Sequence, residues 1–131
     1  MNPRSGFTIV ELNHVALSVS DVAASARFYH DLLGLPELAR PDFPFPGAWY
    51  RIGTTQELHL IGGRVPDDNL GQGHFAMEVS DLEAAAARLR AAGVAFRGPA
   101  SRPDGAQQIF TADPDGNVVE LCGDLPGRGG R

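Results

Sequence analysis

A stretch of nine residues recurs in this chain at a fixed offset, and this repeat limits the possible folds more than any other feature. Residues 13–21 (NHVALSVSD) resemble residues 73–81 (GHFAMEVSD) at an offset of 60 residues. Towards the ends of the two halves, residues 58–62 align with residues 119–123 at an offset of 61. Because self-similarity at a fixed offset is typical of duplicated units, the sequence predicts two modules of about 50 residues each.

The module boundaries follow from the repeat and from the local composition. Module one covers about residues 9–62 and module two about residues 73–123, and the linker of about residues 62–72 is rich in turn-forming residues. The glycine-rich tail, residues 124–131, is expected to be flexible. A chain of 131 residues is long enough to bury a core of its own, so residues 1–131 are predicted to form a single domain.

The same order of elements, βαβββ, is predicted for both modules, which makes the fold class α+β. Alternating apolar and polar residues predict the first strand of each module. The helix that follows is expected to begin at Ser20 or Asp21 in module one, and at Ser80 with Glu83 as a capping box in module two. The later strands are predicted at residues 36–40, 48–52 and 56–61, and at residues 94–97, 107–112 and 117–122.

Four potential metal ligands occupy repeat-related strand positions. His14 and His74 share a position on the first strand of each module, and His59 and Glu120 share one on the last strand. If an approximate two-fold axis relates the modules, these four side chains converge on one point. Three imidazoles and a carboxylate suit a divalent first-row metal such as Ni, Zn, Mn, Co or Fe(II). Glu57, on the same strand face as His59, is the alternative fourth ligand.

Other residues have both a functional and a structural interpretation. Glu78 lies four residues after the second module's histidine and faces the same way, so it is either a general base near the metal or a carboxylate paired with an arginine. The aromatic segment 41–47 walls a pocket, forms a subunit contact or packs on the barrel. Trp49 and Phe110, aligned at an offset of 61, are expected to line the cavity or the core. His30 is expected on the helix surface without a functional role.

The composition excludes several classes of protein. All 11 basic residues are Arg, which excludes Schiff-base lysine chemistry and a P-loop, since both need Lys. The net charge of −5 argues against nucleic-acid binding. The absence of a long apolar run or a signal-peptide pattern predicts a cytoplasmic protein that does not enter a membrane. A single cysteine, Cys122, excludes an internal disulfide framework.

Taken together, these motifs resemble the vicinal oxygen chelate superfamily, which includes glyoxalases, bleomycin-resistance proteins and extradiol dioxygenases. The resemblance covers about residues 9–123. It is carried by His14-Val-Ala-Leu-Ser-Val-Ser-Asp21, Arg27-Phe28-Tyr29 and Leu33-Gly34 in module one, and by Gly73-His74 and Asp113-Pro-Asp-Gly-Asn-Val-Val-Glu120-Leu in module two.

The resemblance implies a glyoxalase-like fold, in which paired βαβββ modules form an open, eight-stranded, barrel-like cup around the metal. It also implies a homodimer with shared sites. His14 and His59 would then come from one subunit, and His74 and Glu120 from its partner. The sequence leaves open whether the modules pair in this way or within one chain.

The implied activity is metal-dependent and acts on a small substrate chelated through two oxygens. Lyase or isomerase chemistry would proceed through a metal-stabilised enediolate-type intermediate, with Glu120 or Glu78 moving a proton. The alternatives are an Fe(II) extradiol-type dioxygenase and a non-catalytic protein that binds a drug or metabolite.

Several family positions depart from the better-known branches. Ser18 and Gly63 stand where glyoxalase I usually has Arg and Asn for glutathione. Ala100 and Phe110 stand where fosfomycin-resistance enzymes have Lys and Tyr. The resemblance therefore indicates the superfamily and leaves the substrate open.

Overall fold

The elements occur in the predicted order in a computed structural model of the chain, which describes residues 6, 10–65 and 74–123. The predicted flexible tail and most of the predicted linker lie outside the described residues. Module one contains β1 (His14–Ser18), α1 (Val22–Ala26), a π-helix (Arg27–Leu32), β2 (Glu37–Leu38), β3 (Gly47–Ile52) and β4 (Gln56–Ile61). Module two contains β5 (His74–Glu78), α2 (Leu82–Ala91), β6 (Phe96–Ser101), β7 (Gln107–Ala112) and β8 (Val118–Gly123).

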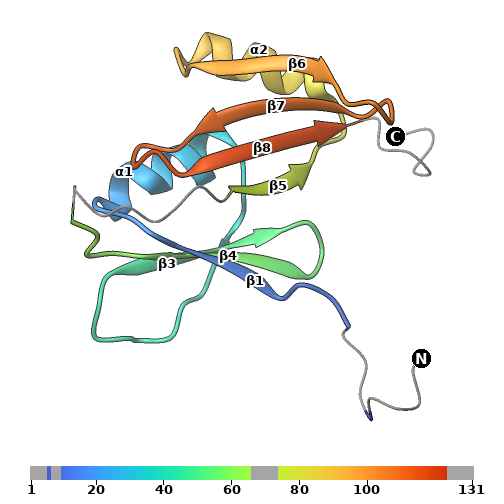
Figure 1. The fold of residues 1–131 in the computed structure, drawn as a ribbon. Helices are drawn as coiled ribbons and strands as arrows, with labels where there is room; N and C mark the ends of the chain where they lie inside the picture. The colour runs from blue at the N-terminus through green and yellow to red at the C-terminus, as the bar shows by residue number, and fades with distance from the viewer. Residues whose placement is uncertain (1–5, 7–9, 66–73, 124–131) are drawn as a thin grey trace.

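Each module forms its own four-stranded mixed sheet. The strand orders are β1-β4-β3-β2 and β5-β8-β7-β6, so the first and last strands of each module pair in parallel while the other pairs are antiparallel. Figure 1 shows the two sheets as separate layers, open rather than closed into a barrel. The α+β class and the two βαβββ modules are thus confirmed.

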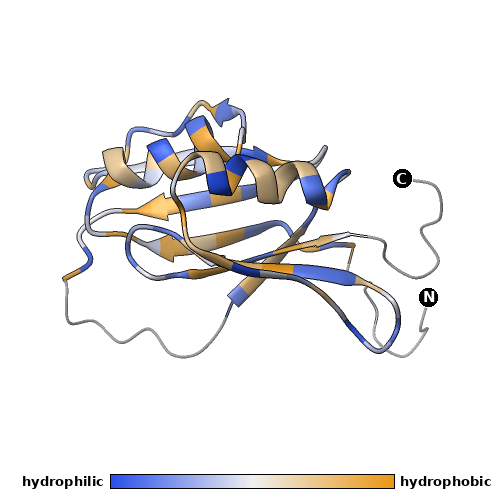
Figure 2. Ribbon diagram, turned by 90° about the horizontal axis from the view of Figure 1, so that it is seen from above, coloured by the Kyte–Doolittle hydropathy of each residue, from blue (hydrophilic) through white to orange (hydrophobic). Residues whose placement is uncertain are grey.

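Alternation along the strands separates a core face from a polar face in each sheet, and Figure 2 shows these hydropathy bands. In the first sheet Tyr50, Leu58 and Leu60 are buried. In the second sheet Ile109 and Val119 are fully buried. These residues belong to one hydrophobic cluster that spans both modules. The residues between them in sequence point to the opposite face of each sheet, and the predicted ligands lie there.

Both helices begin at an aspartate. Asp21 and Asp81 have extended backbones, and their carboxylates accept hydrogen bonds from the backbone N–H groups of Ala24 and Ala84 at 3.1 Å. One of the two predicted caps of the first helix is therefore confirmed. The predicted capping box that starts at Ser80 is wrong, because capping by the next residue moves the helix start by one position.

The first helix widens into a π-helix after Ala26, which the apolar spacing did not predict. Its two consecutive aromatic residues, Phe28 and Tyr29, are both buried. His30, on the same turn, is exposed, and its Nδ1 lies 2.7 Å from the backbone oxygen of Leu35. This contact with the segment that follows the helix agrees with a local structural role for His30.

Hydrogen bonds from the turn between β7 and β8 connect module two to module one. The Tyr29 hydroxyl donates to Asp113 Oδ2 at 2.8 Å, and both residues are buried. Asp113 Oδ1 also accepts from the backbone N–H groups of Asp115 and Asn117. The Asp115 carboxylate accepts from the backbone N–H of Ser20 at 3.1 Å. Burial and the neighbouring Asp113 carboxylate raise the pKa of Tyr29, so its phenol stays a donor.

None of the helices within the described ranges is long and apolar enough to cross a membrane.

Tyr29→Phe is expected to lower the free energy of unfolding by about 1–2 kcal/mol, because a buried oxygen of Asp113 loses one of its two donors and keeps only the Asn117 side-chain amide. Urea denaturation measures the change. Tyr50→Phe is the matched control, because the described part of the chain offers no hydrogen bond to the Tyr50 hydroxyl, and it should change the stability by less than about 0.5 kcal/mol. Equal effects of the two substitutions would show that the hydrogen bond between Tyr29 and Asp113 does not stabilise the contact between the modules.

Candidate metal centre

Two of the predicted ligands meet on the polar face of the first sheet. The rings of His14 and His59 stack with centroids 4.1 Å apart. They are diagonal neighbours on the paired strands, because His59 is the register partner of Ala16, two residues after His14 on the same face of β1. We call this pair half-site one. His14 is exposed, and its Nδ1 lies 2.8 Å from Asn13 Oδ1. The His59 side chain is only 13% exposed, since it lies between His14 and Trp49.

Glu57 lies beside His59, as the predicted alternative ligand should. Its Oε1 is 2.8 Å from His59 Nε2, and Arg51 Nη1 is 3.5 Å from its Oε2. An ionised carboxylate only accepts hydrogen bonds, so the histidine nitrogen donates. This hydrogen bond is the main cause that lowers the pKa of Glu57, and Arg51 adds to it. The carboxylate is therefore ionised and near the histidine pair at neutral pH.

The other two predicted ligands meet on the equivalent face of the second sheet. His74 Nε2 lies 3.0 Å from Glu120 Oε1. The Glu120 side chain is only 7% exposed, whereas that of His74 is 44% exposed. We call this pair half-site two. The rings of Phe110 and His74 pack edge to face with centroids 5.7 Å apart. Phe110 therefore lies beside the site, in agreement with one of the two locations predicted for it.

Gln108 lies beside half-site two and was not predicted from the sequence. Its side-chain amide donates to Glu120 Oε2 at 2.9 Å. Each oxygen of this buried carboxylate therefore has one partner. Gln108 lies two residues before Phe110, on the same face of β7, and this spacing was the available signal. Its role is to hold the carboxylate in place.

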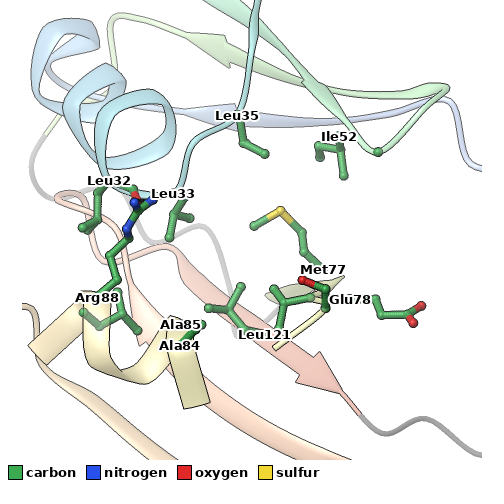
Figure 3. A pocket seen from close by; sticks show the side chains of 14 residues that line it. Leu32, Leu33, Leu35, Ile52, Met77, Glu78, Ala84, Ala85, Arg88 and Leu121 are labelled. Atoms are coloured by element: carbon green, nitrogen blue, oxygen red, sulfur yellow. Dashed lines mark hydrogen bonds between the residues drawn. The ribbon is translucent and has the colours of Figure 1, made fainter. Parts of the chain in front are cut away.

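Glu78, the other predicted catalytic carboxylate, lies at the far end of β5 from His74. Four residues of strand correspond to about 13 Å. Glu78 lines a cavity of about 550 Å³ between the modules, together with Leu32, Met77 and Arg88. Figure 3 shows Glu78 and Arg88 on opposite sides of this cavity. The structure thus places Glu78 away from His74 along β5, although both lie two residues from Ala76, the register partner of Glu120. Its role as a base stays a prediction.

The four donors fit a divalent first-row metal in their chemistry, with three imidazoles and one buried carboxylate. Their placement is divided, because each sheet carries two of them. Among the residues that the structure describes, no three His, Cys, Asp or Glu side chains of one chain are grouped to hold a metal ion. A single chain therefore presents two half-sites at equivalent positions on two separate sheets.

The sequence of this chain is similar to those of several known proteins. The family model described as Glyoxalase/Bleomycin resistance protein/Dioxygenase superfamily matches residues 11–121. Lactoylglutathione lyase of Neisseria meningitidis is 33% identical over 123 residues, which cover 86% of this chain and 89% of that protein. Glutathione transferase FosA of Serratia marcescens is 37% identical over 115 residues, which cover 84% of this chain and 78% of that protein.

Solved structures with a similar fold include one lyase and one binding protein. Lactoylglutathione lyase of Agrobacterium tumefaciens superposes with a TM-score of 0.73 at 24% identity, over 89% of this chain and 96% of that chain. TnmS3, an antibiotic binding protein from Streptomyces sp. CB03234, superposes with a TM-score of 0.76 at 26% identity, over 89% of this chain and 98% of that chain.

Gln108→Leu is expected to lower the free energy of unfolding of the metal-free protein by about 1–2 kcal/mol, because one oxygen of the buried Glu120 carboxylate loses its donor. Urea denaturation measures the effect. Gln107→Leu is the control, since the Gln107 side chain donates to the Ser101 hydroxyl in an exposed place, and this substitution should change the stability by less than about 0.5 kcal/mol. A Gln108→Leu protein as stable as the wild type would show that Gln108 does not support Glu120.

Proposed function

The chain belongs to the glyoxalase/bleomycin resistance protein/dioxygenase superfamily, and from this premise we propose that it is a metal-dependent enzyme. Its substrate would be a small molecule that binds the metal through two vicinal oxygens. The proposed reaction is of the lyase or isomerase type. His14, His59, His74 and Glu120 are the proposed ligands.

The observation that carries this proposal is the equivalence of the two half-sites. Each has a histidine at the first position of an outer strand and a second donor on the central strand beside it. A packed core gives no reason to repeat costly polar groups at matched positions. The exposure of both first-strand histidines also leaves their rings open to a further ligand.

We propose that the two half-sites of one centre come from different chains of a homodimer. β1 and β5, which carry the first-strand histidines, are edge strands of their sheets, so each has an unpaired side that another chain can approach. Within one chain, the bond between Tyr29 and Asp113 fixes the modules in an arrangement that keeps the donors in two pairs. A symmetric dimer would join half-site one of each chain to half-site two of its partner.

The chain's own residues would divide the chemical work. A divalent cation supplies the positive charge that stabilises oxyanion character on a substrate chelated through two oxygens. Glu120 is the proposed proton carrier, because its buried carboxylate is held by Gln108 and His74 and can take up and return a proton near the substrate. Glu78 is the second candidate for this role.

A second candidate function is ligand binding without turnover. The similarity to TnmS3, which is an antibiotic binding protein, and the aromatic residues beside half-site one favour it. This function does not require the metal, so metal dependence of ligand binding separates the two candidates. An Fe(II) dioxygenase remains a variant of the first candidate, distinguished by oxygen consumption with iron.

His14→Gln and Glu120→Gln are each expected to weaken Zn²⁺ binding at least about 100-fold, because each removes one ligand of the same centre. Competition with a chromophoric chelator measures the affinity. His30→Gln is the matched control and should bind like the wild type, since the His30 ring contacts the Leu35 backbone oxygen just after its own helix. The same assay on Glu57→Gln and His59→Gln decides which of the two side chains is the fourth ligand.

Mixing the His14→Gln and Glu120→Gln proteins is expected to restore tight binding. In a dimer with shared centres, each mixed dimer has one intact centre and one that lacks both ligands. Free exchange of chains makes half of the dimers mixed, so about a quarter of all centres should bind Zn²⁺ as the wild type does. No recovery after denaturation and joint refolding would place all four ligands of a centre in one chain.

A further inference from the structure

A continuous series of aromatic rings begins at half-site one and leads away from it. His59 stacks on Trp49 with centroids 4.0 Å apart and planes 3° apart. Trp49 contacts Phe43 at 6.2 Å, and Phe43 stacks on Phe45 at 5.2 Å. With His14, the series contains five rings. We call Trp49, Phe43 and Phe45, which extend it beyond the two histidines, the aromatic platform.

The platform is held by its own segment. The Arg40 guanidinium carbon lies 5.0 Å from the centroids of both Phe43 and Phe45, and Arg40 Nη2 donates to the Phe45 backbone oxygen at 2.9 Å. A Cβ added at Gly47 would collide with the Leu60 backbone oxygen and would lie only 2.9 Å from Arg40 Nε. Glycine therefore leaves room both for the pairing of β3 with β4 and for the Arg40 side chain. Pro41, Pro44 and Pro46 restrict the same segment. The rings are therefore preorganised rather than loosely placed.

Two rings of this fixed platform remain partly open. Phe43 and Phe45 are 40% and 41% exposed, although a large apolar side chain gains about 1.5–3 kcal/mol when it is fully buried. Phe110 is the counterpart of Trp49 in module two, where it packs against His74. The described residues of module two have no counterpart of Phe43 and Phe45, because the turn between β6 and β7 carries the exposed ion pair of Arg102 and Asp104 instead. The two exposed phenylalanine rings are thus a feature of half-site one only.

We propose that the aromatic platform is a binding subsite for a planar aromatic group of the substrate. The inference rests on the proposed function, since it places the two chelating oxygens at the metal and the ring of the same molecule beside Trp49 and Phe43. An aromatic ring gains stacking and edge contacts on such a surface that a saturated ring of the same size does not. Trp49, Phe43 and Phe45 are the proposed specificity determinants, and Arg40 is a positioning residue.

Three 2-hydroxy acids test this proposal with the same pair of chelating oxygens. Mandelate carries a phenyl ring, hexahydromandelate a cyclohexyl ring and lactate a methyl group. Trp49 is the only tryptophan of the chain, so its single indole N–H signal in an NMR spectrum reports binding at the platform. Titrations use the wild-type protein with Zn²⁺, which is diamagnetic, and the same protein without metal.

Mandelate is expected to bind at least about fivefold more tightly than hexahydromandelate, as expected for one aromatic contact. The double variant Phe43→Leu with Phe45→Leu should lose this preference. Phe96→Leu, the same substitution in β6, is the control and should keep it. Thermal unfolding of the variants checks that each is folded.

Equal affinities for mandelate and hexahydromandelate, or no binding of either, would overturn the aromatic subsite. A preference that survives in the double variant would overturn the assignment to Phe43 and Phe45. The proposed metal centre fails in a different way, because Zn²⁺ would then tighten none of the three acids while the preference for mandelate in the metal-free protein persists.

Discussion

The parallel pairing of the first and last strand in each module determines where every candidate ligand lies. His14 and Glu57 are register partners, as are Ala76 and Glu120. Residues in step across paired strands share a face, and a slip of one residue would move every donor into the core. The fully buried residues on the opposite faces, such as Leu58 and Val119, resist such a slip. The core therefore fixes the geometry of both half-sites.

The contacts between the modules use other surfaces than the half-sites. The buried bond of Tyr29 to Asp113 and the docking of Asp115 on Ser20 join the first helix to the turn before β8. The polar faces of the sheets take no part in these contacts. This division supports the proposed dimer, in which contacts between its own modules hold each chain together and a second chain completes the metal centre.

Much of this arrangement could be predicted from local patterns. The strands at residues 56–61 and 107–112 have the predicted bounds, because alternation and flanking turns define them within a few residues. The pairing of donors within each sheet follows from the same alternation. The π-helix and the hydrogen bond from Gln108 to Glu120 depend on tertiary contacts, which a local pattern does not contain. A local pattern also does not say whether the two half-sites of one centre come from the same chain or from two chains, because the same four residues would be used in both cases.

In the proposed dimer, one metal centre needs residues of two chains. Native mass spectrometry during a Zn²⁺ titration tests it most directly, because it weighs monomers and dimers separately with their bound metal. We expect dimers that carry two zinc ions and monomers that carry none. A monomer that binds one zinc ion as tightly as the dimer would contradict this expectation.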